Sequence, residues 1–239
     1  MSEQVQNKVA MVIVAHPDDA EFEGAGAAAL WARAGWDVYY VICTDGSGGG
    51  PDEATDVSMA ARQKVIDMRM QEQRDACAAL GVKDVKFLGY PDGQLQPTLE
   101  VRRDIVRLLR QYRPSRVICQ SPERTWEPSF IIQRYHPDHL AAGRAAIEAI
   151  YPASQNPWDF PELLEQEHLH PHKVSEIYIT GAPTINFTLD ISPVMDQKIE
   201  ALRAHRSQLT QDFDRIEEFV RSWSAQIGKK FGAAYAEQF

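Results

Sequence analysis

The sequence lacks the features that would place it in a membrane or outside the cell. No run of about 18 or more apolar residues occurs, and the opening residues, MSEQVQNK, contain no apolar stretch like that of a signal peptide. Cysteine is scarce, and its three residues show no CxxC spacing, so a disulfide framework is not expected. We therefore expect a reduced, cytoplasmic protein with no membrane partner.

Positive charge is also in short supply. The chain has 34 acidic and 25 basic residues, which give a formal net charge of −9. Surfaces that bind nucleic acid need clustered lysine and arginine, so the charge balance argues against a nucleic-acid partner and favours a small molecule. The length of 239 residues and the 44% hydrophobic content are typical of a single globular domain.

What the sequence does contain is an alternation of apolar runs and helical patterns. We expect strands buried on both faces at residues 8–15, 37–44, 84–89, 116–120 and 174–181. We expect helices at about residues 21–34, 58–80, 98–112 and 138–150. The alternation predicts the α/β class, as a single Rossmann-like domain over residues 1–239 with a mostly parallel sheet flanked by helices.

The last third of the chain departs from this alternation. Residues 154–173, rich in proline and polar side chains, are expected to form an insertion or a lid loop. Their three histidines are expected to be solvated rather than to bind a metal. A further strand at 186–191 and C-terminal helices at about 193–208 and 211–236 are expected to close one side of the sheet.

The stretch AHPDDAEFEG follows the first predicted strand and places His16, Asp18 and Asp19 together. Helix capping explains one aspartate. It does not explain the second aspartate or the histidine, and clustered acids cost electrostatic energy unless a cation offsets them. Ligands of open α/β sheets bind at the carboxyl ends of the strands, so this stretch predicts a metal site at that edge.

A second histidine-containing stretch, YHPDHLAAG, follows the fourth predicted strand and should reach the same edge. His136 and His139 are three positions apart, so they share a face in a first helical turn, and Asp138 could orient an imidazole. One histidine can bind the metal while the other stays free for acid catalysis. Both stretches together predict a metal-dependent hydrolase that activates a water molecule.

The motifs AHPDDAE and HPDH resemble the paired motifs of the PIG-L/LmbE-like family of zinc-dependent de-N-acetylases, which act on N-acetylglucosaminyl groups and related amides. The resemblance implies that His16, Asp19 and His139 bind Zn²⁺. It also implies that Asp18 is the general base. The expected enzyme is an amidohydrolase that removes an acetyl group from an N-acetylglucosaminyl-type substrate and releases acetate.

Further roles are implied by the same resemblance. His136 would be the cation or acid that stabilises the oxyanion, and Asp138 would support it. Arg69, in the RMQEQRDACAALG segment, would lie at the substrate pocket. The C-terminal HRSQ segment also resembles the family's pattern, although we expect its His205 to pack or cap a helix, outside the catalytic set. The resemblance is compatible with a homo-oligomer.

Alternative functions share parts of these patterns. The set His16, Asp19 and His139 also suits a non-haem iron oxygenase, although the extra carboxylate of Asp18 favours hydrolysis. Gly24, Gly26 and Ala29 match the outline of a dinucleotide-binding motif, but acidic residues precede them where a pyrophosphate would sit. A non-catalytic metal-binding or sugar-binding domain would bind without turnover.

Overall fold

A parallel sheet of five strands forms the centre of the molecule. The computed structural model describes residues 7–126, 135–209 and 212–239. The strand order is β3-β2-β1-β4-β5, and all neighbouring strands in it run parallel. The predicted α/β fold is therefore confirmed. The strands are β1 (Val9–Val14), β2 (Asp37–Thr44), β3 (Asp84–Tyr90), β4 (Arg116–Gln120) and β5 (Glu176–Thr180).

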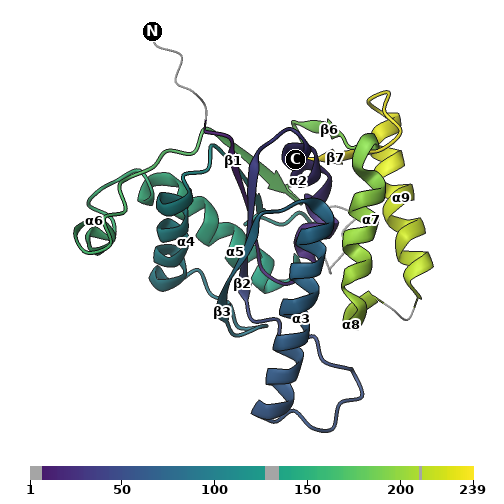
Figure 1. Cartoon of the computed structure of the whole chain (residues 1–239), viewed down its shortest axis with the longest axis horizontal. Coiled ribbons are helices and arrows are strands. Elements are labelled where there is room, and N and C mark those ends of the chain that lie inside the picture. The colour runs from purple at the N-terminus through teal and green to yellow at the C-terminus, as the bar shows by residue number, and fades with distance from the viewer. Residues whose placement is uncertain (1–6, 127–134, 210–211) are drawn as a thin grey trace.

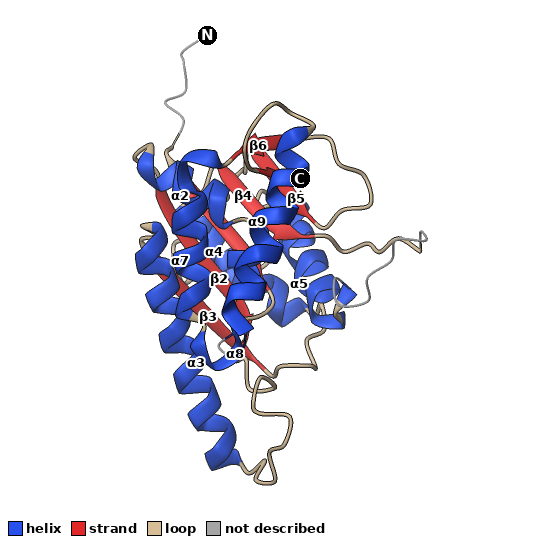
Figure 2. Cartoon of the chain, turned by 90° about the vertical axis from the view of Figure 1, so that its right-hand side faces the viewer, coloured by secondary structure: helices blue, strands red, loops and turns tan. Residues whose placement is uncertain are grey.

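Helices cover both faces of this sheet because its central strands are apolar on both sides (Figures 1 and 2). In β1, Val12 points into one hydrophobic cluster and Ile13 into the other. Helices on the first face are α2 (Ala25–Arg33), α3 (Met59–Leu80), α7 (Met195–Ala204) and α9 (Phe213–Lys229). Helices on the second face are α4 (Leu99–Tyr112) and α5 (Pro137–Glu148).

Several predicted helices have different bounds in the structure; the one predicted at 193–208 is interrupted at His205, and glycines account for two further differences. The helix predicted at 21–34 is divided at Gly24 into α1 (Asp19–Glu23) and α2. A Cβ atom at Gly24 would lie 3.1 Å from Cδ1 of Ile118 in β4, so the glycine lets this bend approach the sheet closely. The helix predicted at 211–236 ends at Lys229, because the chain turns back through Gly232, which has a φ of 74°.

After this turn the chain forms a strand that the sequence pattern did not predict. Strand β7 (Ala236–Gln238) pairs antiparallel with β6 (Thr188–Asp190), which lies within the run predicted at 186–191. The carboxylate of Glu237 in β7 accepts hydrogen bonds of 2.8 Å from the amides of both Gly26 and Ala27, at the start of α2. It also pairs with Lys198 at 2.7 Å, and both side chains are buried.

This arrangement explains Gly26 without a nucleotide. A Cβ atom there would lie 2.5 Å from Cγ2 of Ile191 and 2.8 Å from Oε1 of Glu237. The glycine therefore permits the close approach of the C-terminal strand, and the amides at the start of α2, which would bind a pyrophosphate, already bind Glu237. Close packing against the C-terminal strand thus explains the glycine of the partial dinucleotide-binding motif.

The segment 154–173 lies against α4 and includes the short helix α6 (Pro161–Glu165), at the left in Figure 1. The guanidinium of Arg110 is buried, and its Nη2 donates to the carbonyl oxygens of Ala153, Asn156 and Asp159 at 2.8–3.0 Å. These contacts hold the segment near the C-terminal end of α4. That position is at the amino edge of the sheet, opposite the edge at which we expected a lid.

The remaining short elements are a π-helical turn after α5 (Ala149–Ala153), a 3-10 turn (Ser192–Val194) and α8 (Arg206–Leu209). Within the described ranges, every helix is too short or too polar to cross a membrane.

Candidate metal and catalytic site

The candidate site lies where the strand order of the sheet reverses. After β1 the chain passes to α1 and α2 on one face, and after its neighbour β4 it passes to α5 on the other. Such a reversal opens a crevice at the carboxyl ends of the strands. Gly143 lets α5 lie close to β4, because a Cβ atom there would be 2.3 Å from the carbonyl oxygen of Gln120. Residues 127–134 of the intervening loop lie outside the described part of the chain.

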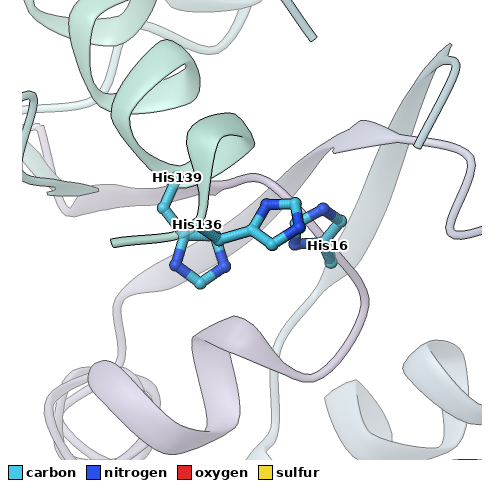
Figure 3. Close-up of side chains that lie close together, drawn as sticks. All are labelled: His16, His136 and His139. Atoms are coloured by element: carbon cyan, nitrogen blue, oxygen red, sulfur yellow. The ribbon is translucent and has the colours of Figure 1, made fainter. Parts of the chain in front are cut away.

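Three histidines from the two predicted stretches meet at this crevice. His16 follows β1, whereas His136 caps α5 and His139 lies in its first turn (Figure 3). One ring nitrogen from each lies within 4.8 Å of the others, and the ring centroids of His16 and His139 are 5.2 Å apart. Two segments more than a hundred residues apart in the sequence are thereby joined at one point.

Asp19 contacts two of these imidazoles through different oxygens. Its Oδ2 lies 3.3 Å from Nδ1 of His16, and its Oδ1 lies 3.0 Å from Nε2 of His139. Burial opposes ionisation of this carboxyl, but the charges and hydrogen bonds of the two histidines outweigh it and hold the pKa of Asp19 well below its usual value. The structure therefore brings together the three residues that were predicted as metal ligands.

A further carboxylate, that of Asp92, contacts His16 and was not among the predicted site residues. Nε2 of His16 lies 3.1 Å from Oδ1 of Asp92 and 3.1 Å from Oδ2 of Asp138. Asp92 follows β3, in the sequence YPDG. The rule that led to the other residues, polar side chains at the carboxyl ends of strands, would also have selected this aspartate.

The charges around His16 indicate that the site is suited to a cation. Asp19, Asp92 and Asp138 all contact its imidazole. Burial disfavours a charged ring, yet hydrogen bonds to these carboxylates raise the pKa of His16 to about 12. A proton thus offsets the negative charge that a divalent metal would offset when bound. Nitrogen and carboxylate donors of this kind suit zinc and other divalent transition metals.

Asp18 occupies an unusual backbone conformation beside these residues. It precedes α1 with a φ of 90°, in the left-handed region that non-glycine residues rarely adopt. Its Oδ2 lies 3.4 Å from Nη2 of Arg69. Burial raises the pKa of Asp18 to about 6, although the charge of Arg69 acts in the opposite direction. A carboxyl with such a pKa can exchange a proton near neutral pH.

Arg69 is buried beside Asp18, and backbone carbonyl oxygens accept hydrogen bonds from both of its terminal nitrogens. Nη1 donates to Gly46 at 3.0 Å, and Nη2 donates to Pro17 at 2.8 Å. A Cβ atom at Gly49 would lie 2.5 Å from Nη1, so the glycine-rich loop after β2 can close over the guanidinium. Arg69 therefore joins this loop to the turn that carries Asp18.

His136 and Asp138 contact each other through the backbone of Asp138, whereas we expected the carboxylate of Asp138 to support His136. The backbone N–H of Asp138 donates to Nδ1 of His136 at 3.2 Å. The carboxylate of Asp138 instead accepts from the amides of Gly93 and Leu95 and contacts His16. It thus supports His16 rather than His136. Burial, followed by the charges of His16 and His139, lowers the pKa of His136.

The fold and the site define a class of protein: a Rossmann-like α/β domain with a histidine–aspartate cluster at the switch point of its sheet. A family model described as "PIG-L: GlcNAc-PI de-N-acetylase" matches residues 11–150. The chain belongs to this family.

Individual relatives are similar over most of the chain. The diacetylchitobiose deacetylase of Thermococcus kodakarensis is 34% identical, and the match covers 96% of this chain and 81% of the relative. The probable N-acetyl-alpha-D-glucosaminyl L-malate deacetylase 2 of Bacillus cereus is 31% identical, with 83% of this chain and 82% of the relative covered.

A solved structure agrees with these matches. The N,N'-diacetylchitobiose deacetylase of Pyrococcus horikoshii, complexed with its inhibitor MPG, superposes with a TM-score of 0.85 at 31% identity. The superposition covers 97% of this chain and 82% of that chain. These relatives are deacetylases and therefore hydrolyse C–N bonds, which does not favour the alternatives of an iron oxygenase or a nucleotide-binding protein.

Proposed function

We propose that the protein is a zinc-dependent de-N-acetylase that removes an acetyl group from an N-acetylated amino sugar. The observation that carries this proposal is the convergence of His16, Asp19 and His139 beside a second carboxylate, Asp18, whose pKa is raised. The family supports the reaction type, and the named activities of the relatives support N-acetylglucosaminyl substrates.

His16, Asp19 and His139 would hold the metal, with one position left for water. Zinc at such a site lowers the pKa of bound water to about 7 and polarises the substrate carbonyl. Asp138 contacts His16 from behind and would fix the orientation of its ring. Asp92 contacts the same nitrogen, Nε2, and would support the ring in the same way, which leaves Nδ1, the nitrogen that faces Asp19, for the metal.

Asp18 would act as the general base and then as the acid. Its carboxylate accepts the proton of the attacking water, and the resulting carboxylic acid returns that proton to the leaving nitrogen. The pKa of about 6 suits both steps, because the group is ionised at neutral pH and still basic enough to accept a proton. Arg69, at 3.4 Å, would hold the carboxylate in place and would also lie at the substrate pocket.

His136 would stabilise the oxyanion even when uncharged. Its Nδ1 accepts the backbone N–H of Asp138, so in the neutral ring the proton resides on Nε2. An N–H donor is therefore available to the carbonyl oxygen without an imidazolium. Removing a single donor of this kind typically costs about 2.7–4 kcal/mol in transition-state stabilisation.

The proposal is tested by separating the base from the ligands. Asp18→Asn should keep the fold and the zinc content but lower kcat by about 10²–10⁴-fold, because the amide cannot accept the proton. His16→Ala and His139→Ala should lose zinc as well as activity. His170→Ala, at an exposed histidine on the opposite edge, is the matched control and should retain both. Metal analysis and an assay for free amine provide the readouts.

The substrate is tested with a panel of N-acetylglucosamine conjugates. N,N'-diacetylchitobiose, the malate conjugate and the inositol conjugate represent the activities named for the relatives. Release of acetate and free amine from at least one of them is expected. Full activity of Asp18→Asn would refute the role of Asp18, and the absence of turnover across the panel by zinc-loaded protein would refute the proposed function.

A further inference from the structure

A chain of buried hydrogen bonds connects the C-terminal HRSQ segment to the backbone of Asp18. Nε2 of His205 lies 3.1 Å from Oε2 of Glu21, and Oε1 of Glu21 accepts from Nε2 of Gln73 at 3.0 Å. Oε1 of Gln73 then accepts from the backbone N–H of Asp18, also at 3.0 Å. The side chains of His205, Glu21 and Gln73 are fully buried, at 0% exposure.

The direction of this chain is fixed by what each group can donate. The carboxylate of Glu21 only accepts hydrogen bonds, so His205 and Gln73 must both present N–H groups to it. With its amide nitrogen turned toward Glu21, Gln73 has only its oxygen left for the N–H of Asp18. Reversal of the Gln73 amide would place two donors against each other at Asp18 and leave two acceptors facing each other at Glu21.

The backbone that donates the last of these hydrogen bonds, at Asp18, is strained. Asp18 has a φ of 90°, a conformation that is unfavourable for a non-glycine residue and persists only where the surroundings enforce it. The hydrogen bond that its amide donates to the oxygen of the fully buried Gln73 side chain is such a constraint. The backbone conformation also determines the direction of the Asp18 carboxylate, because the side chain is attached to the same Cα atom.

Among the described residues, His205 is connected to this chain of hydrogen bonds through one ring nitrogen, Nε2. Its Nδ1 is buried and has no hydrogen-bond partner in the part of the chain that the structure describes. The contact with Glu21 is therefore the one that orients its ring among these residues. The segment also has a separate attachment, because Ser207 donates both its amide and its hydroxyl to Glu72 at 2.7 Å. That second contact does not lead to Asp18.

We propose that Gln73, Glu21 and His205 are positioning residues that hold Asp18 in its reactive orientation through the hydrogen bonds of this chain. The proposal rests on the role of Asp18 in the proposed function. In this proposal His205 contributes to the reaction indirectly, through Glu21 and Gln73. The sequence had instead led us to expect a packing or capping role for it. Glu21 and Gln73 belong to α1 and α3, so three distant parts of the chain share one task.

The test uses the full-length, zinc-loaded protein with N,N'-diacetylchitobiose as the substrate. Gln73→Met keeps the length of the side chain and removes both hydrogen bonds. We expect kcat to fall by about 10- to 100-fold while KM and zinc content change little, because the base is misplaced but the metal and the substrate contacts remain. His205→Leu should cause a similar loss, and His205→Gln, which restores an N–H donor to Glu21, should recover most of it.

Ser207→Ala is the matched control in the same segment. It removes one hydrogen bond to Glu72 and should lower the melting temperature without changing kcat. A readout that needs no catalysis is the hydrogen exchange of the Asp18 amide by NMR, which should become faster in Gln73→Met and in His205→Leu and stay unchanged in Ser207→Ala.

Wild-type kcat in both Gln73→Met and His205→Leu, or unchanged exchange of the Asp18 amide in Gln73→Met, would overturn the positioning role. A loss of kcat that His205→Gln fails to recover would also contradict it. If wild-type protein releases no amine from any conjugate while the Asp18 amide still responds to these substitutions, the proposed function fails and the positioning of Asp18 stands.

Discussion

At the scale of single residues, His172 shows how a histidine that resembles a metal ligand can serve the structure instead. Its Nε2 donates to the carbonyl oxygen of Pro114 at 2.7 Å, and its backbone N–H and C=O bond to Ser154. Burial, with a smaller contribution from the charge of Arg113, lowers the pKa of His172 below 6.5 despite the hydrogen bond to Pro114. The neutral ring is therefore the form that the fold selects.

This preference predicts a pH dependence of stability. Above pH 6.5 the imidazole is neutral in both states, and its contribution to folding is complete. As the pH falls from 6.5 toward the lowered pKa of the folded state, the unfolded chain binds a proton that the folded chain resists, so stability is lost until the folded imidazole is also protonated. Urea unfolding of wild type and His172→Gln should show a difference that is largest near about pH 8 and shrinks toward about pH 5. A constant difference would contradict the assignment.

The sequence predicted site residues where residue type and strand position agreed. His16, Asp19 and His139 follow strands that share an edge, so their meeting could be foreseen. Which histidine the Asp138 carboxylate contacts could not be foreseen, because two histidines lie within reach and only the side-chain rotamers decide between them. The bond from Gln73 to Asp18 was also invisible, since nothing in a helical glutamine indicates which amide it will meet.

At the scale of elements, α4 serves as the support for the segment 154–173. The buried Arg110 donates to carbonyl groups of this segment, whereas Arg107, one turn earlier, pairs with Glu167 at the surface. Both arginines attach the same segment to the same helix, in different surroundings. They therefore form a matched pair for measuring what burial contributes.

Arg110→Met should lower the free energy of unfolding by about 2–3 kcal/mol, because buried carbonyl groups lose a charged donor. Arg107→Met, at a partly exposed ion pair, should cost less than about 1 kcal/mol. Proteolytic cleavage within the segment should become faster only in Arg110→Met. Turnover below the melting temperature should be unchanged in both, because the segment lies at the edge opposite the site. Equal stability losses would show that burial does not set the strength of this anchor.

Element boundaries were predicted best where a local signal fixed them. Thr98 accepts a hydrogen bond from the amide of Val101, and the expected helix at 98–112 is confirmed as α4. The strand after α9 was missed because three residues carry little pattern of their own, and β7 exists only through its pairing with β6. Tertiary pairing of this kind cannot be read from periodicity.

At the scale of the whole molecule, the alternation of strands and helices predicted a parallel sheet but not its order. The order depends on which strand packs beside which, and that is decided by long-range contacts. The same holds for the buried pair of Lys198 and Glu237, which joins α7 to β7 and caps α2.

Glu237→Ala should destabilise the protein by about 3–5 kcal/mol, since it leaves the ammonium of Lys198 buried without its partner. Adding Lys198→Met to this variant removes the uncompensated charge and should recover part of the loss. Thermal or urea unfolding of the two single variants and the double variant measures the coupling. A double variant that is less stable than Glu237→Ala would contradict this account of the pair.

The late position of these partners in the chain has a consequence for synthesis. The start of α2 is capped by Glu237, and the turn with Asp18 is held through His205, so elements formed early in the chain depend on residues that are synthesised much later. A polypeptide interrupted before these residues lacks both supports. Polypeptides that terminate before His205 and Glu237 should therefore be inert and readily degraded.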